Sequence, residues 1–448
     1  MNKPSSEYIL DISKEYSIYV CSQRAIASIC DGLKDVQRKS IWLLRNKSDK
    51  IKTISLAGEL ISSGIYVHGD ASASGAISML AAPYANNVPL LDGIGTFGTR
   101  VAPNEYAAPR YTYVKKSKTV EKFLLNDLEI VPLKDNYDGS VKEPVHFLPL
   151  IPTILLNGVS GIAVGWSTEI LPRTFKDLVQ ATLDALDGKT LKKLKPSYSY
   201  LTVDVVHIEG NTWEFSGKAS VVDSSTIGIT ELPPAMALEH IKARLDKMEE
   251  DGAINSYVDR STETIDIKVK LARGSVKGWT AAQCVDFLKL RSKKTERIVV
   301  IDWNGTSIRQ YETAEEVVQA FVEWRLGWYK IRYEKLLADD EYEIQYWRAV
   351  KLCFDNDLPK GLGKIKDKQA IEDKVKNITK TLDIDVKQLD KIVSLPTYRW
   401  AQDYYLVVLE KIKELEENIA LYTAVLADES LRRAIYRDEL VELRKLGI

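Results

Sequence analysis

The sequence has few residues of the types that bind metals or form disulfides. Its 448 residues include four cysteines and four histidines. The cysteines form no C-x-x-C pair, and no two histidines are four residues apart. Because zinc sites and disulfide frameworks depend on such spacings, this composition argues against a self-sufficient metalloenzyme and indicates a reducing, cytoplasmic compartment.

Long apolar runs and a strong net charge are also missing. No segment approaches the roughly 20 apolar residues that a membrane span needs, and the N-terminus lacks the apolar stretch of a signal peptide. The 62 basic and 63 acidic side chains almost cancel. Residues 1–120 nevertheless carry a net charge of +5, which leaves −6 for the remainder. The N-terminal part is therefore the candidate for binding an anionic ligand.

Helical periodicity dominates the first part of the chain. Residues 22–45 read as helix, loop and helix, and residues 51–62 form a further amphipathic helix that ends at a Ser-Gly turn. Another helix begins near Asp70, which we expect to be its N-cap. The first two turns of this helix contain almost only small residues, so it can lie close to another surface.

From about residue 145 the pattern changes to strands with helices between them. We predict helices at 235–250 and 279–291. Alternating apolar residues predict strands in these segments: 201–210, 211–217, 226–233, 263–271 and 297–305. The mixture predicts a separate α+β domain that extends to about residue 310.

The last third contains two long helices. Thr313 and Glu316 form a capping box before a helix that runs to about residue 350. Apolar residues spaced alternately by three and four positions predict a coiled-coil seam at Tyr405, Val408, Ile412, Leu415, Ile419, Tyr422 and Leu426. Shorter charged helices at 355–400 suggest an antiparallel hairpin whose tip associates with a second copy. A helical bundle that packs on its own chain is the alternative.

Gly93, Gly95 and Gly98 have the G-x-G-x-x-G spacing of dinucleotide-binding proteins. Such a site needs a helix directly after the glycines, and Pro103 and Pro109 exclude one of normal length. A nucleotide-dependent oxidoreductase is therefore disfavoured. We expect the glycines to shape a loop whose purpose lies further along the chain.

Directly downstream, Arg110 and Tyr111 precede the cations Lys115, Lys116 and Lys118. A phenol with a pKa of about 10 is hardly ionised at pH 7. An adjacent guanidinium can stabilise both a phenolate and the negative charge that develops on a phosphate under attack. This arrangement fits a tyrosine that attacks a phosphodiester, although composition alone would not select Tyr111 among 22 tyrosines.

Five motifs then follow one another in a characteristic order. They are SQRAIASICDGLKDVQRKS (22–40), YVHGDAS (66–72), LLDGIGTFG (90–98), APRYT (108–112) and IPTILLNGVSGIAVG (151–165). The set closely resembles the DNA breakage-reunion subunit of type IIA topoisomerases, which includes the A-type subunits of gyrase and topoisomerase IV. Since little follows the coiled coil, the chain looks most like the compact medium subunits of T-even-type phages.

The resemblance implies roles for individual residues. Tyr111 would be the nucleophile that forms a transient 5′-phosphotyrosyl link, and Arg110 would stabilise the transition state. Residues implied to contact DNA are Arg24, Lys34, Arg38, Lys39 and His68, with Ile151 as an apolar wedge between base pairs. Ala71 and Gly75 occupy the positions of the serine and the acidic residue that anchor quinolones in bacterial enzymes. Departures from the family pattern are Asp35 for proline, Tyr66 for histidine and Tyr113 for glutamate.

The resemblance also implies an α+β multidomain architecture. Its parts would be an N-terminal arm (1–24), a winged-helix domain (25–144), a tower domain (145–312) and a coiled coil with a C-gate dimerisation region (313–448). The arm would contact a partner chain that carries the ATPase and TOPRIM domains, binds ATP and holds Mg²⁺, while this chain would bind no metal.

The implied assembly is a homodimer on double-stranded DNA, joined by two copies of that partner. With no room for a β-pinwheel after Ile448, we expect relaxation and decatenation rather than negative supercoiling. A non-catalytic architectural DNA-binding protein with a helix-turn-helix remains the alternative.

Overall fold

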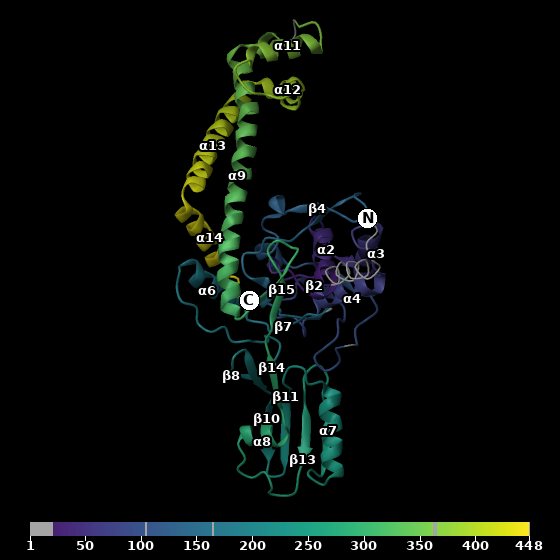
Figure 1. The fold of residues 1–448 in the computed structure, drawn as a ribbon. Helices are drawn as coiled ribbons and strands as arrows, with labels where there is room; N and C mark the ends of the chain where they lie inside the picture. The colour runs from purple at the N-terminus through teal and green to yellow at the C-terminus, as the bar shows by residue number, and fades with distance from the viewer. Residues whose placement is uncertain (1–20, 104, 164, 362–364, 448) are drawn as a thin grey trace, which may run out of the picture. The chain divides into compact units, whose positions relative to one another are not determined.

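The structure is a computed structural model that describes residues 21–103, 105–163, 165–361 and 365–447 (Figure 1). These residues form two compact units. The first comprises the described residues up to Arg325 together with those from Glu439 onward, and the second is Leu326–Asp438. The predicted N-terminal arm lies mostly outside the described residues. Within the described part of the chain, no helix has both the length and the apolar character needed to cross a membrane.

The first unit begins with helices packed on a small antiparallel sheet. The helical elements are η1 (Cys21–Ala25), α2 (Asp35–Leu44), α3 (Thr53–Ser62) and α4 (Asp70–Ala81). The sheet has the order β1-β3-β2, formed by Ile51–Lys52, Tyr113–Lys116 and Leu91–Ile94. The predicted helices at 51–62 and after residue 70 are confirmed. The predicted N-cap is corrected by one position, because Gly69 is the N-cap and Asp70 is the first helical residue.

Short elements connect this region to the next sheets. They are α5 (Lys118–Phe123), η2 (Leu128–Ile130), β4 (Leu133–Asp135), β5 (Lys142–Pro144), η3 (Thr153–Leu155), β6 (Val159–Ile162), β7 (Ser167–Ile170) and α6 (Phe175–Leu186). Strands β6 and β7 pair antiparallel, with Ile162 opposite Ser167. The N-cap of helix α6 is Thr174, whose hydroxyl accepts a hydrogen bond from the amide of Asp177.

Two further antiparallel sheets follow in the first unit. One has the order β14-β9-β8 (Arg291–Thr295, Thr212–Ser216, Asp204–Glu209), and the other has the order β10-β11-β13-β12 (Lys218–Asp223, Thr226–Glu231, Ile267–Lys270, Ser256–Asp259). Helix α7 (Leu238–Glu250) lies along the four-stranded sheet, α8 (Ala281–Phe287) precedes β14, and β15 (Ile298–Ile301) pairs with β16 (Ile308–Tyr311) (Figure 1). Alternate residues of β11 and β13 fill the core, as period-two strands require.

The sequence did not predict β10, β12 or β14. Strand β14 reads Arg-Ser-Lys-Lys-Thr and has no apolar alternation, so its pairing with β9 supplies the strand signal. The helix predicted at 279–291 is correspondingly shorter and ends at Phe287. The domain bounds at 144/145 and 312/313 stay predictions.

The second unit is a helical hairpin with a small cluster of helices at one end (Figure 1). Its elements are α9 (Ala314–Asp355, which starts in the first unit), α10 (Leu358–Gly361), α11 (Lys368–Ile378), α12 (Val386–Val393), η5 (Thr397–Trp400) and α13 (Gln402–Ala427), followed by α14 (Glu429–Arg444), which ends in the first unit.

Contacts between the two long helices confirm the predicted antiparallel hairpin. Arg348 bonds Glu416 at 2.8 Å, and Tyr405 bonds Asp355 at 2.8 Å. Seam residues Val408, Ile412 and Leu415 are buried in the core that the tip helices share. Association with a second copy stays a prediction.

Candidate active site

The candidate nucleophile Tyr111 lies in a turn just before β3. Its backbone amide donates to the carbonyl of Ala108 at 2.8 Å, while its side chain is 65% exposed. The guanidinium carbon of Arg110 lies 4.7 Å from the centroid of the Tyr111 ring. The phenol of Tyr111 is therefore exposed to solvent, with the guanidinium of Arg110 over its ring. A macromolecular substrate can reach a side chain in this position.

The glycine-rich segment forms a loop against this turn. The amide of Ala107 donates to the carbonyl of Thr96 at 3.0 Å. Gly95 has a φ of +107°, and a Cβ there would lie 3.3 Å from the Cγ2 of Thr112. A side chain at Gly95 would thus be strained and crowd the residue after Tyr111. The loop predicted from the glycines is confirmed, and it borders the R-Y-T turn.

Two cations that the sequence did not single out lie near this turn. The ammonium groups of Lys50 and Lys52 lie 5.0 and 6.0 Å from the ring centroid of Tyr113. Tyr113 is the residue that replaces the family's glutamate. Their strand pairing explains the proximity, because β1 pairs with β3 with Lys52 opposite Tyr113. Pairing over a distance of about 60 residues leaves no local sequence signal.

Arg24 and His68 are brought together, although 44 residues separate them. Arg24 Nη2 donates to His68 Nδ1 at 3.0 Å. Because a guanidinium only donates, Nδ1 must be unprotonated, and the imidazole is neutral. Burial and, after it, the charge of Arg24 lower the pKa of His68. Tyr66, the replacement for the family's first histidine, packs edge-on against His68 at 5.2 Å.

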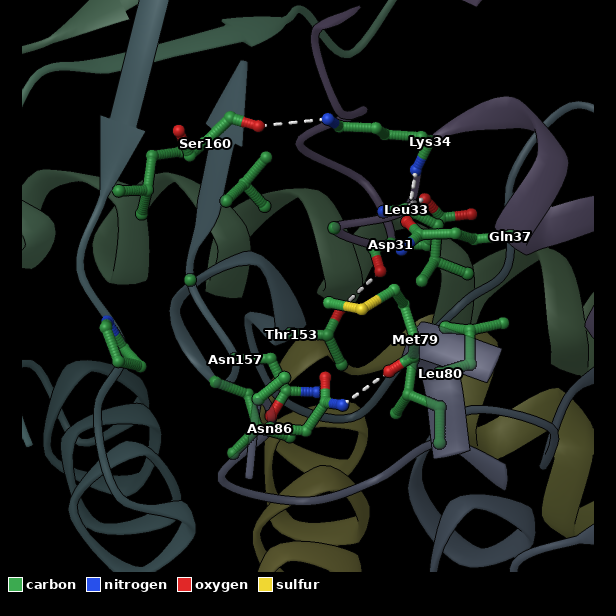
Figure 2. A pocket seen from close by; sticks show the side chains of 18 of the residues that line it. Asp31, Leu33, Lys34, Gln37, Met79, Leu80, Asn86, Thr153, Asn157 and Ser160 are labelled. Carbon is green, nitrogen blue, oxygen red and sulfur yellow. Dashed lines mark hydrogen bonds between the residues drawn. The ribbon is translucent and has the colours of Figure 1, made fainter. Parts of the chain in front are cut away.

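Lys34 lies at the edge of a cavity of about 390 Å³. Its ammonium donates to the carbonyl of Ser160 in β6 at 3.0 Å, and Figure 2 shows this bond between two of the residues that line the cavity. Met79, Asn86 and Asn157 contribute to the opposite wall (Figure 2). Burial lowers the pKa of Lys34. Lys34 is therefore a half-buried cation that joins the start of α2 to β6.

Arg38, one of the predicted DNA contacts, lies in a buried ion pair. Arg38 is buried, and it donates to both carboxylate oxygens of Asp31 at 2.6 and 2.9 Å and to the carbonyl of Leu33 at 2.9 Å. Asp31 also accepts from the amide of Phe147 at 2.9 Å. Arg38 thus supports the segment that carries Lys34, and its predicted contact with DNA stays a prediction.

Lys39, another of the predicted DNA contacts, is also buried and paired with carboxylates. Its buried ammonium lies 2.9 Å from Asp35 and 3.0 Å from Glu143, and Glu143 is 3.3 Å from Lys134. Asp35 is the residue that replaces the family's proline. The additional carboxylate therefore neutralises a cation of its own helix, one turn away.

Ile151, the predicted apolar wedge, is buried in this structure. Its side chain is 0% exposed, whereas that of Ile162 is 87% exposed. Both isoleucines belong to the motif at 151–165, and motif matching alone did not distinguish them. Gly161 directly precedes Ile162, and a Cβ at Gly161 would overlap the carbonyl oxygen of Ala25. This close approach fixes β6 and leaves Ile162 as the exposed apolar residue.

The two drug-site positions lie on the first turns of α4. Ala71 is exposed and Gly75 is half-buried. A Cβ at Gly75 would meet no atom of the described residues within 4 Å. This face of the helix is therefore open to a ligand but offers neither a hydroxyl nor a carboxylate at these two positions.

The described residues do not fit a magnesium site. They include no group of three or more histidine, cysteine, aspartate or glutamate side chains that could hold a metal ion. The carboxylates of Asp35 and Glu143 are paired with Lys39.

Comparison with known proteins gives the family. The family model for the A-type subunit of DNA gyrase/topoisomerase IV matches residues 24–441. The DNA topoisomerase medium subunit of Enterobacteria phage T4 is 30% identical over 416 residues, which is 90% of this chain and 91% of that protein. DNA topoisomerase 2-alpha of Gallus gallus is 31% identical over 342 residues, or 73% of this chain and 22% of its own length.

A solved structure gives the fold. The DNA-binding, cleavage and re-ligation domain of Plasmodium falciparum topoisomerase II superimposes with a TM-score of 0.82 at 23% identity, covering 97% of this chain and 64% of that one. The α+β architecture is therefore that of a type II topoisomerase cleavage domain. By sequence, the chain belongs to the family of A-type subunits of DNA gyrase and topoisomerase IV. The predicted function, DNA cleavage and religation within a type IIA topoisomerase, is confirmed at this level.

Proposed function

We propose that Tyr111 is the nucleophile of the cleavage reaction. Its phenolic oxygen attacks the scissile phosphorus, a new P–O bond forms, and the bond to the 3′ oxygen breaks. The proton lost by the phenol is balanced by one gained at the released 3′ hydroxyl. The product is a 5′-phosphotyrosyl link that the reverse reaction reseals. The exposed phenol beneath the Arg110 guanidinium carries this proposal.

The neighbouring residues supply DNA contacts in this proposal. Arg24, with the neutral His68 beside it, and Lys34 are the cationic contacts to the backbone. The wedge role passes from Ile151 to Ile162, because an apolar residue must be exposed to enter a base step. Helices α3 and α4 with the sheet β1-β3-β2 would form the winged-helix region that holds the cut duplex.

The complete enzyme is proposed to need a second chain. A partner with ATPase and TOPRIM domains would bind ATP and supply Mg²⁺, since the described residues form no metal cluster. The second unit would join two copies of this chain at the C-gate, and the assembly would relax and decatenate DNA, as the phage relationship suggests.

Peptide mapping tests the nucleophile directly. The chain is incubated with its TOPRIM-bearing partner, Mg²⁺ and supercoiled plasmid, denatured with detergent and digested. We expect mass spectrometry to find the nucleotide on Tyr111. An adduct on another side chain contradicts the proposal, and DNA binding with no adduct at all favours the architectural alternative.

Alanine substitution should affect DNA bending at Ile162 and protein stability at Ile151. We expect Ile162→Ala to change the free energy of unfolding by less than about 0.5 kcal/mol, since its side chain is exposed. It should lower the bent population of bound duplex about tenfold, or roughly 1.4 kcal/mol. Ile151→Ala, which empties a buried site, should cost about 2–5 kcal/mol of stability. Energy transfer between dyes on the duplex ends and urea unfolding measure the two effects. Normal bending by Ile162→Ala would remove the wedge role.

We expect quinolones to be weak at trapping the cleavage complex of this enzyme with DNA. Neither Ala71 nor Gly75 can accept a hydrogen bond from the water shell of a drug-bound metal, and two lost hydrogen bonds correspond to about a tenfold weaker effect. We expect Ala71→Ser/Gly75→Glu to restore sensitivity, because the space at Gly75 is open. Detergent-trapped cleavage against drug concentration measures this. Trapping of the native enzyme at the low concentrations that act on bacterial gyrase would contradict the prediction.

A further inference from the structure

The turn that carries Tyr111 is held by the first residues of α3. The amide of Thr53 donates to the carbonyl of Thr112 at 3.0 Å, and the amide of Ile54 donates to that of Pro109 at 3.2 Å. The first amides of a helix have no partner within the helix. Here two of them bond carbonyls on both sides of Tyr111, so the helix start and the turn form one hydrogen-bonded unit.

A pair of buried hydroxyls completes this unit. Thr53 Oγ1 and Thr112 Oγ1 lie 2.8 Å apart, and both side chains are buried. Each hydroxyl can serve as donor or acceptor to the other. Removing one leaves the other without this partner in a buried place, which is more costly than losing an exposed hydrogen bond.

The location of the pair explains how it bears on Tyr111. Strands β1 and β3 pair with Ile51 opposite Val114 and Lys52 opposite Tyr113, and the Thr53–Thr112 contact continues this register to the first residue of α3. Gly95 closes the other side, because a Cβ there would lie 3.3 Å from Thr112 Cγ2. The backbone is thus fixed directly after Tyr111, while the phenol itself is exposed.

We propose that Thr53 is a positioning residue for the cleavage reaction. Its hydroxyl fixes Thr112 and thereby sets the position from which the Tyr111 oxygen reaches phosphorus. The inference rests on the proposed function of Tyr111 as nucleophile. A misplacement of about 1 Å between reacting atoms costs on the order of 10²-fold in rate. A buried hydroxyl pair one residue away is therefore sufficient to affect catalysis without touching DNA.

Valine and serine substitutions separate positioning from stability. Thr53→Val keeps the shape and removes the hydroxyl, whereas Thr53→Ser keeps the hydroxyl. The variants are purified with the TOPRIM-bearing partner, and single-turnover cleavage and resealing of a duplex oligonucleotide are measured. We expect Thr53→Val to slow both rate constants at least about tenfold and by a similar factor, since a misplaced nucleophile affects a reaction and its reverse alike. Thr53→Ser should stay within about twofold of native.

Two further variants control for folding. The double variant Thr53→Val/Thr112→Val leaves neither hydroxyl unpaired, so we expect it to regain thermal stability without regaining rate. Thr182→Val removes a buried hydroxyl in α6 that bonds the carbonyl of Leu178, and it should cleave at the native rate. A smaller active fraction in the Thr53 variants with unchanged rate constants would overturn the proposal. An equal loss of rate in Thr182→Val would also overturn it.

Failure of this inference is distinguishable from failure of the proposed function. If the native enzyme places the nucleotide on a residue other than Tyr111, the proposed function fails and the inference with it. If the adduct is on Tyr111 and Thr53→Val cleaves at the native rate, only the positioning role is lost.

Discussion

Replacing Tyr111 by phenylalanine is expected to abolish covalent DNA adducts while duplex binding stays within about twofold of native. Phenylalanine keeps the ring beneath Arg110 but lacks the oxygen that forms the bond to phosphorus. Loss of a nucleophile costs at least about 10⁴-fold in rate, which is below detection in a cleavage assay. Detergent-trapped cleavage measures the adduct, and fluorescence anisotropy of a labelled duplex measures binding.

Another exposed tyrosine provides the matched control. Tyr398 in η5 is 70% exposed and also lies near an arginine, with Arg399 at 6.0 Å from its ring centroid. Tyr398→Phe should cleave normally. If Tyr111→Phe retained adducts, another side chain would have to form the bond, and the assignment of the site would fail.

The second large effect is a loss of stability, which we expect when Arg38 is replaced by methionine. Arg38→Met leaves the Asp31 carboxylate buried without its guanidinium partner, and breaking such a pair costs about 3–5 kcal/mol. We expect the urea midpoint of the first unit to fall accordingly. Where the variant is folded, the dependence of DNA affinity on salt should be unchanged, because the Arg38 guanidinium is buried and already paired with the Asp31 carboxylate.

Lys34→Met supplies the contrast to Arg38→Met. It loses one hydrogen bond to a carbonyl, so its stability should change by about 1 kcal/mol. If Lys34 neutralises one phosphate, the slope of log affinity against log salt should fall by about 0.9. A reduced slope for Arg38→Met would identify Arg38 as a DNA contact and contradict this expectation.

Helical periodicity carried most of the fold prediction. Helix α3 buries Thr53, Leu56, Ala57 and Leu60, which is the spacing that identifies an amphipathic helix in sequence. The seam of α13 is identified in the same way. Strand β14 has no such pattern, because what makes it a strand is its pairing with β9, 75 or more residues away. Local patterns report which face is buried, and they do not report pairing partners.

In the candidate site, too, contacts between sequence neighbours could be predicted, whereas contacts between distant residues could not. Adjacent residues such as Arg110 and Tyr111 could be paired from sequence, and the structure places them in contact. The burial and ion pairing of Arg38 and Lys39 could not be predicted from neighbouring residues. Part of their surroundings comes from Glu143 and Phe147, which lie more than a hundred residues further along the chain. A motif identifies a cation. Only the fold shows whether that cation is already neutralised.

The close approach of β6 to η1 restricts how this protein can diverge. A methyl group at Gly161 would overlap the carbonyl oxygen of Ala25, so any substitution of this glycine by another amino acid displaces the strand that ends in Ile162. The sequences of η1 and β6 must therefore change in a coordinated way, because their backbones are in close contact at Ala25 and Gly161. Substitution at position 161 is therefore accessible to an evolutionary lineage only after a compensating change elsewhere.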